Sequence, residues 1–188
     1  MPDKKPYMYT DMSERDFIRW NLDYSMRLVL ATWDAIAEQY ICKQPKPYLA
    51  ALAFVFGNIA VKERIHHAGF ACGINDIPEK YAIFHGFRMP TEAELETAVE
   101  SKQALVDYWR EVREKTLQLL AGMSDADLKN IPKNSVISDG APNRDNPIRE
   151  AYVMSIMNQN ARWGELRVLQ SVIENEIAGN ECPIRPGI

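Results

Sequence analysis

The chain has few of the residues on which most metal and redox sites depend. Among its 188 residues are three histidines and three cysteines, and Cys42, Cys72 and Cys182 lie far apart in the sequence. No two of these cysteines form a C-x-x-C pair, so the sequence indicates neither a zinc ribbon nor a disulfide framework. We therefore expect reduced thiols, as is usual for cytoplasmic proteins.

Clustered positive charge and long apolar segments are also lacking. Lys and Arg total 22 against 26 Asp and Glu, for a net charge of -4, and the basic residues are dispersed. This distribution argues against a nucleic-acid partner, which needs cations gathered against phosphates. The longest apolar run, Tyr48 to Val61, contains Gly57 and Asn58 and is too short to span a bilayer. Because the first residues also lack the apolar core of a signal peptide, we expect a cytoplasmic protein with no membrane partner.

Four stretches of the sequence have helical periodicity, and none alternates like a β-strand. The helices are predicted over about residues 13–40, 47–73, 91–120 and 147–178. Ser13, Pro47 and Pro147 are suitable first-turn or capping residues, and Thr91 with Glu94 forms a capping-box pattern. The length suits one domain. The sequence thus predicts an all-α fold: a single domain over residues 1–188, with a four-helix bundle at about 13–178.

Two connections between the predicted helices are long. Residues 71–90 show no clear regular structure. Residues 130–146 contain two prolines, a glycine and several Asn and Asp residues, which predicts a long irregular loop before the last helix. Such a loop suits a crossover connection or the cover of a pocket.

Three polar residues fall on otherwise apolar helical faces. Asn58 lies in the middle of the second predicted helix, while Asn158 and Arg162 lie one turn apart on the last. The interior of a helical bundle is apolar and dry, so inward polar side chains mark the places where chemistry can occur. We expect these three residues to meet at one level of the bundle.

Three segments resemble the DinB-like superfamily of bacterial four-helix bundles. They are the I-A-V-K-E sequence of the second helix, the segment FRMPTEAELETAVESKQALVDYWREVREKTLQLLAGMSDADL, and the run N-Q-N-A-R-W-G-E-L on the last helix. The resemblance covers about residues 16–173. It implies a DinB-like bundle, a homodimer, and a metal held by three histidines, one on the second helix and two on the last in an H-x-x-x-H spacing. The family includes metal-dependent thiol transferases and isomerases that use low-molecular-weight thiols.

In this chain the positions that match the family's metal ligands are Asn58, Asn158 and Arg162, followed by Gly164 and Glu165. None is histidine, an amide oxygen is a poor ligand for zinc or nickel, and arginine brings a positive charge where the cation would bind. The resemblance therefore implies a degenerate metal site, and we expect no cofactor.

Two interpretations of that replacement stay open. In the first, Asn58, Asn158, Arg162 and Glu165 line a pocket for a carboxylate or another small anionic or amphipathic ligand. In the second, the two amides bond to each other or to water and Arg162 pairs with Glu165 or Glu63. The polar cluster then only sets the register of a structural or partner-binding bundle.

The histidines themselves offer a weaker metal site. Glu63 and His66 form an E-x-x-H pair, but no histidine follows His85, so the second pair of a di-iron centre is missing. Glu63, His66, His67 and His85 could hold one zinc or nickel ion, as in an enzyme of the thiol-transferase type with a relocated metal. Otherwise, we expect His66 at the edge of the core and His67 and His85 in contact with solvent.

Thiols and aromatic residues point to no reaction. Cys42 and Cys72 have no base beside them in the sequence, which favours inert thiols. Aromatic residues on the first helix, Trp20, Tyr24 and Trp33, widen its predicted buried face. Together with the aromatic second helix they favour a homodimer.

Overall fold

The regular structure of the protein is helical throughout the described part of the chain. The computed structural model describes residues 12–74, 76–86, 88–133, 135 and 146–176. The long helices are α1 (Glu14–Asp34), α2 (Leu52–Arg64), α4 (Lys102–Ala121) and α5 (Ile148–Glu176). The shorter ones are η1 (Glu38–Tyr40), η2 (Ile65–Ala71), η3 (Glu79–Phe84), α3 (Glu92–Ala98) and η4 (Asp127–Lys129). Of these, η2 is a π-helical continuation of α2, whereas η1, η3 and η4 are 3₁₀ helices.

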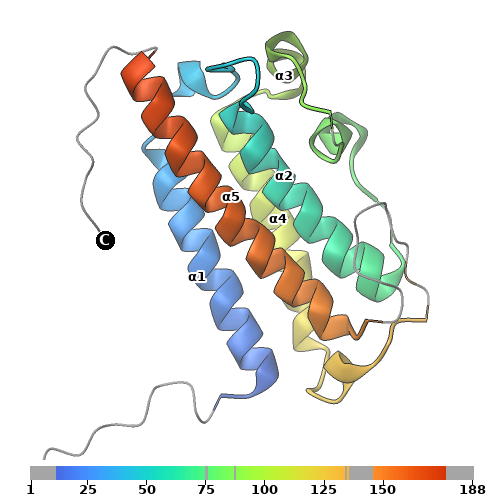
Figure 1. Ribbon diagram of the computed structural model, residues 1–188. Helices are drawn as coiled ribbons and strands as arrows, with labels where there is room; N and C mark the ends of the chain where they lie inside the picture. The colour runs from blue at the N-terminus through green and yellow to red at the C-terminus, as the bar shows by residue number, and fades with distance from the viewer. Residues whose placement is uncertain (1–11, 75, 87, 134, 136–145, 177–188) are drawn as a thin grey trace, which may run out of the picture.

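The four long helices lie side by side around a common core, with α5 packed between α1 and α2 (Figure 1). Helix α2 packs against both α4 and α5, and α1 packs most extensively against α5. Every residue of α2 from Leu52 to Val61 is buried, so this short helix supplies much of the core. At its centre the ring of Phe56 packs against Trp33 of α1 and Trp109 of α4, with centroids 4.2 and 5.4 Å away.

Helix α1 begins where the sequence predicts but ends earlier. The Ser13 hydroxyl accepts a hydrogen bond from the amide of Asp16 at 3.1 Å and caps the first turn. The predicted extension to Tyr40 is wrong, because α1 ends at Asp34 and η1 follows. The ammonium group of Lys102 donates to the carbonyl oxygens of Asp34 and Ile36, at 3.1 and 2.6 Å. If α1 continued, these carbonyl groups would accept hydrogen bonds from backbone amides of the next turn, and the ammonium group of Lys102 takes the place of those amides.

The predicted helix over residues 91–120 is two helices. Its capping box is confirmed, since Thr91 and Glu94 each bond to the other's backbone amide and begin α3. Helix α3 then ends at Ala98, and Val99 takes an extended conformation. The Ser101 hydroxyl accepts a bond from the amide of Ala104 at 3.0 Å and starts α4 in a new direction.

The connections differ from expectation in one respect. Residues 71–90 contain the 3₁₀ helix η3, which inserts the fully buried Phe84 into the core. Of the predicted loop over residues 130–146, positions 134 and 136–145 lie outside the described residues, as does the predicted end of the last helix at residue 178. No helix among the described residues is long and apolar enough to cross a membrane.

The aromatic residues of α1 are not all buried. Trp33 is fully buried, as its place on the helix suggested. Trp20 and Tyr24 instead stack on each other at the surface, with ring centroids 5.2 Å apart, and Tyr24 is 45% exposed. Tyr24 therefore adds to the surface of α1, whereas Trp20 is half-buried.

Candidate functional site

Asn58 and Arg162 contact each other across the interface between α2 and α5. Asn58 is only 2% exposed, and its side-chain oxygen accepts a hydrogen bond from Arg162 Nε at 3.2 Å. Its amide nitrogen donates to the backbone carbonyl of Phe84 at 2.8 Å. Asn58 thus joins three segments of the fold: α2, α5 and η3.

The position of Phe84 depends on Gly57, a residue that no sequence motif marks as functional. A Cβ atom added to Gly57 would lie 2.6 Å from the Phe84 ring, closer than side-chain atoms approach in folded proteins. The absence of a side chain at Gly57 lets this ring pack directly on α2. That contact holds the Phe84 carbonyl where Asn58 bonds to it.

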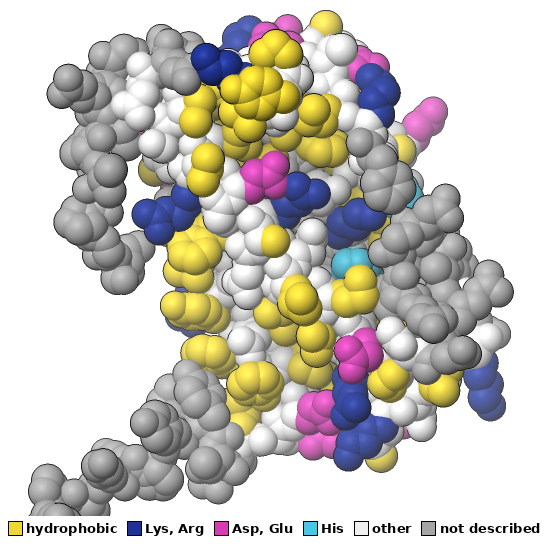
Figure 2. Space-filling model, viewed as in Figure 1, with side chains coloured by type: hydrophobic (Ala, Val, Ile, Leu, Met, Phe, Trp, Pro, Cys, Tyr) yellow, Lys and Arg dark blue, Asp and Glu magenta, His cyan; other side chains and the backbone are white. Residues whose placement is uncertain are grey.

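Arg162 extends from this buried contact toward solvent. Its Nη1 donates to the carboxylate of Glu165 on the next turn of α5, and the two side chains are 30% and 35% exposed. Lys62 of α2 lies close by. Burial, with a further contribution from the positive charge of Arg162, lowers the pKa of Lys62 below its ordinary value. Figure 2 shows basic and acidic side chains in the middle of this face, over α5 and α2.

Asn158 does not join this group. Its side chain is half-buried, and it forms no hydrogen bond with Asn58 or with Arg162. The structure therefore brings together Asn58, Arg162 and Glu165 of the four candidate ligand-binding residues. Of the two partners expected for Arg162, Glu165 is confirmed, whereas Glu63 is wrong because it pairs with Arg113.

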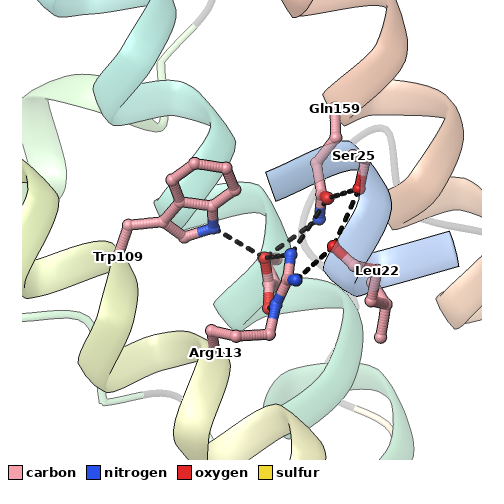
Figure 3. A network of polar contacts seen from close by, with 6 residues as sticks. Leu22, Ser25, Trp109, Arg113 and Gln159 are labelled. Atoms are coloured by element: carbon pink, nitrogen blue, oxygen red, sulfur yellow. Dashed lines mark hydrogen bonds and ion pairs between the residues drawn. The ribbon is translucent and has the colours of Figure 1, made fainter. Parts of the chain in front are cut away.

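Glu63 is at the centre of a buried polar network that the sequence patterns did not reveal. Figure 3 shows the side chains of Trp109, Arg113 and Gln159 converging in this network. Arg113 of α4 forms a two-point ion pair with it, at 2.7 and 3.0 Å. Trp109 Nε1 and Gln159 Nε2 also donate to the Glu63 carboxylate, at 2.8 and 2.9 Å. The network reaches α1 because Arg113 donates to the Leu22 carbonyl and the Ser25 hydroxyl donates to Gln159. All four long helices meet in this cluster.

The Glu63–Arg113 pair is ionised despite its burial. Glu63 is 0% exposed and Arg113 is 4% exposed. Burial by itself would raise the pKa of Glu63, but the charge and hydrogen bonds of Arg113 outweigh it and hold this pKa below its ordinary value. Because both carboxylate oxygens accept hydrogen bonds from side chains of other helices, Glu63 links these helices to α2.

His66 and His67 are both buried in η2, the π-helix that continues α2 from Ile65. The expectation that His67 contacts solvent is wrong, since it is 1% exposed and its ring packs on Tyr152 with centroids 4.2 Å apart. Burial lowers the pKa of His66 to about 4 and that of His67 to about 3, so both rings are neutral near pH 7. His85 is half-buried at the end of η3.

The weaker metal site finds no geometric support. Within the described ranges, no three His, Cys, Asp or Glu side chains are placed to hold a metal ion together. Glu63, the acidic member of the suggested set, is engaged by Arg113.

The thiols show no sign of activation. Burial raises the pKa of both Cys42 and Cys72, which keeps them protonated near neutral pH. Cys182 lies outside the described residues.

The chain was compared with protein-family models, curated proteins and solved structures, and none of the three comparisons returned a match. The DinB-like resemblance therefore rests on the three sequence segments that carry it.

Proposed function

We propose that this chain is a DinB-like four-helix bundle without the family's metal triad, and that it binds a small anionic or amphipathic ligand beside Arg162. The observation that carries the proposal is the contact between Arg162 and Asn58. It joins two positions that match the family's metal ligands, and it leaves the guanidinium group within reach of solvent. An arginine held in this way can bind a carboxylate through two parallel hydrogen bonds.

Neighbouring charges support an anionic ligand. Lys62 adds a second cation near Arg162: burial lowers the pKa of Lys62, and repulsion from the charge of Arg162 lowers it further. A bound anion would relieve that repulsion. Glu165 neutralises Arg162 in the absence of ligand, and a carboxylate ligand would replace Glu165 or bind beside it.

Titration with decanoate, as an amphipathic anion, and citrate, as a polar one, tests this function. Calorimetry or NMR should detect binding to the wild type, and Arg162→Met should weaken it at least about tenfold, equivalent to about 1.4 kcal/mol. Arg167→Met is a matched control on the same helix and should bind as the wild type does. If Arg162→Met gains thermal stability and keeps its affinity, Arg162 serves only the register of the helices. One equivalent of zinc or nickel per chain, in protein purified without a histidine tag, would overturn the metal-free proposal.

We also propose that the chain forms a homodimer through α1 and α5. Five large apolar side chains are at least 40% exposed on these two adjacent helices: Phe17, Tyr24, Val153, Met157 and Val168. Apolar side chains also appear along the α1 and α5 side of the molecule in Figure 2. Contiguous exposed apolar surface commonly marks a protein interface. Analytical ultracentrifugation should give twice the chain mass, and Met157→Glu should shift the protein toward the monomer.

A further inference from the structure

The guanidinium group of Arg162 has one nitrogen left for a ligand. Its Nε donates to Asn58 at 3.2 Å, and its Nη1 donates to Glu165. Among the described residues, Nη2 has no hydrogen-bond partner. Because Asn58 holds Nε, two parallel hydrogen bonds to one oxyanion need Nη1 as well as Nη2. A ligand bound in this way therefore takes the place of Glu165 on Nη1.

Glu165 is an internal competitor for that position. It lies three residues after Arg162 on the same helix, so its carboxylate acts at a high effective concentration. A free monocarboxylate would exchange one singly charged group for another and would gain little from its charge alone. An anion that replaces Glu165 must therefore find attraction beyond Arg162.

Lys62 supplies that attraction. It follows Asn58 by four residues on α2, and residues at this spacing are neighbours on one face of a helix. Lys62 is half-buried, and after burial the charge of Arg162 is the further cause that lowers the pKa of Lys62, so the two cations interact. A doubly charged oxyanion attracts both cations at once, whereas a singly charged one leaves part of their repulsion in place.

His66 is a third polar group in this region, one turn beyond Lys62. It is 5% exposed, and its Nδ1 is buried without a hydrogen-bond partner among the described residues. Burial, and then the charge of Lys62, lowers the pKa of the His66 ring, so Lys62 interacts with His66 as well as with Arg162. Because side chains on a helix lean toward its N-terminus, Lys62 and His66 both lean toward the level of Asn58. Figure 2 shows a histidine beside Lys and Arg side chains on this face.

We propose that the site at Arg162 binds a phosphate monoester as its dianion. Two terminal oxygens accept hydrogen bonds from Nη1 and Nη2 of Arg162 in place of Glu165, and the third accepts from Lys62 and the His66 ring. A phosphate monoester offers the three terminal oxygens and nearly two negative charges that these groups call for. This inference rests on the proposed function, and it narrows the ligand from any small anion to a doubly charged one.

Titration with methyl phosphate and dimethyl phosphate, at pH 7.5 and constant ionic strength, tests the charge of the ligand. Both are small tetrahedral phosphates, but at this pH the monoester carries close to two negative charges and the diester carries one. NMR should show saturable shifts of the Arg162 Nε–H and the His66 ring C–H signals with methyl phosphate. Dimethyl phosphate should bind at least about tenfold more weakly. Lys62→Met should remove most of this difference, because it removes the second cation.

Replacing Glu165 tests its role as a competitor. Glu165→Gln should raise the affinity for methyl phosphate at least about threefold, because the amide carries no charge to hold Arg162. Glu150→Gln, near the start of α5, makes the same change in net charge away from the site and should leave the affinity unchanged.

The inference is overturned if methyl phosphate causes no saturable shift, if dimethyl phosphate binds equally well, or if Glu165→Gln gains no more affinity than Glu150→Gln. The proposed function survives any of these results if decanoate or citrate still binds and Arg162→Met still weakens that binding. If decanoate, citrate and methyl phosphate all fail to bind, both proposals are overturned.

Discussion

Replacing Arg113 with methionine tests whether the buried polar network holds the helices together. Methionine keeps much of the volume of the arginine side chain but removes its charge and its hydrogen bonds. In the wild type, Arg113 contacts both oxygens of Glu63, the carbonyl of Leu22 and the side-chain oxygen of Gln159. Arg113→Met therefore leaves a carboxylate without its counter-charge at a position that is 0% exposed.

The contacts that remain set the size of the loss. Removing one partner of a buried ion pair costs about 3–5 kcal/mol. Trp109 and Gln159 still donate to the Glu63 carboxylate in the variant, at 2.8 and 2.9 Å, and stabilise part of its charge. We therefore expect the lower end of that range, about 3 kcal/mol. This is a large fraction of the total stability of a typical domain.

Urea unfolding followed by circular dichroism measures this loss. A decrease of about 3 kcal/mol should lower the urea midpoint by about 1–2 M. Arg110→Met, one turn earlier on α4 and exposed, should change the free energy of unfolding by less than about 1 kcal/mol. The double variant Glu63→Leu with Arg113→Met should lose much less than the sum of the two single losses, because it leaves no unpaired charge.

The dependence on pH provides a second check. The lowered pKa of Glu63 means that its ion pair stabilises the wild type above the carboxyl's ordinary pKa, and that this contribution is lost as the pH falls through the lowered value. In Arg113→Met, burial without the counter-charge raises this pKa, so protonation relieves the penalty. The deficit of the variant relative to the wild type should therefore shrink as the pH falls. A loss below about 1 kcal/mol, or additive losses in the double variant, would refute this account of the network.

Two further predictions concern packing and titration near the same helices. Gly57→Ala should displace the Phe84 ring and weaken the hydrogen bond between Asn58 and the Phe84 carbonyl. We expect the free energy of unfolding to fall by about 1–3 kcal/mol in urea unfolding, with Gly122→Ala as the control. His67 is buried and neutral beside Glu63 and Arg113, and its pKa is lowered to about 3. As the pH falls below about 6.5, the histidine is therefore protonated in the unfolded state before it is protonated in the folded state, and the wild type should lose stability. The variant His67→Phe keeps a ring against Tyr152. It should remove about 2 kcal/mol of the decrease in the free energy of unfolding between about pH 6.5 and 5. An unchanged pH dependence in this variant would show that His67 is not buried and neutral.

Local sequence signals located the starts of α1, α3 and α5, but the start predicted at Pro47 is wrong, because α2 begins at Leu52. The Ser13 cap and the Thr91–Glu94 box act through side chains within three residues of the amides they bond, so the sequence alone contains both partners. Ser101 also bonds within three residues, because its hydroxyl accepts from the amide of Ala104 and caps α4. Continuous apolar periodicity on both sides concealed that start and made two helices look like one.

Residues that act across helices were harder to identify. Arg113 follows Val106 and Trp109 at helical steps of three and four residues, so it lies on the buried face of α4. A charged residue on such a face is the signal in the sequence that indicates a buried ion pair. Its partner Glu63 is 50 residues away, and nothing in the local sequence selects it over other acidic residues. Asn58 and Arg162 were found as polar residues on apolar faces, yet Asn158, chosen by the same criterion, does not join them.

The sequence by itself determined that the chain is helical, where most helices begin, and which helical faces are apolar. These properties depend on hydrogen bonds and periodicities that extend over a few residues. Only the tertiary structure decided that Glu63 pairs with Arg113, that His67 is buried, and that Asn58 bonds to Arg162 while Asn158 does not join them. The reason is that such pairings depend on the register in which separate helices pack, and that register is set by the fit of the whole core.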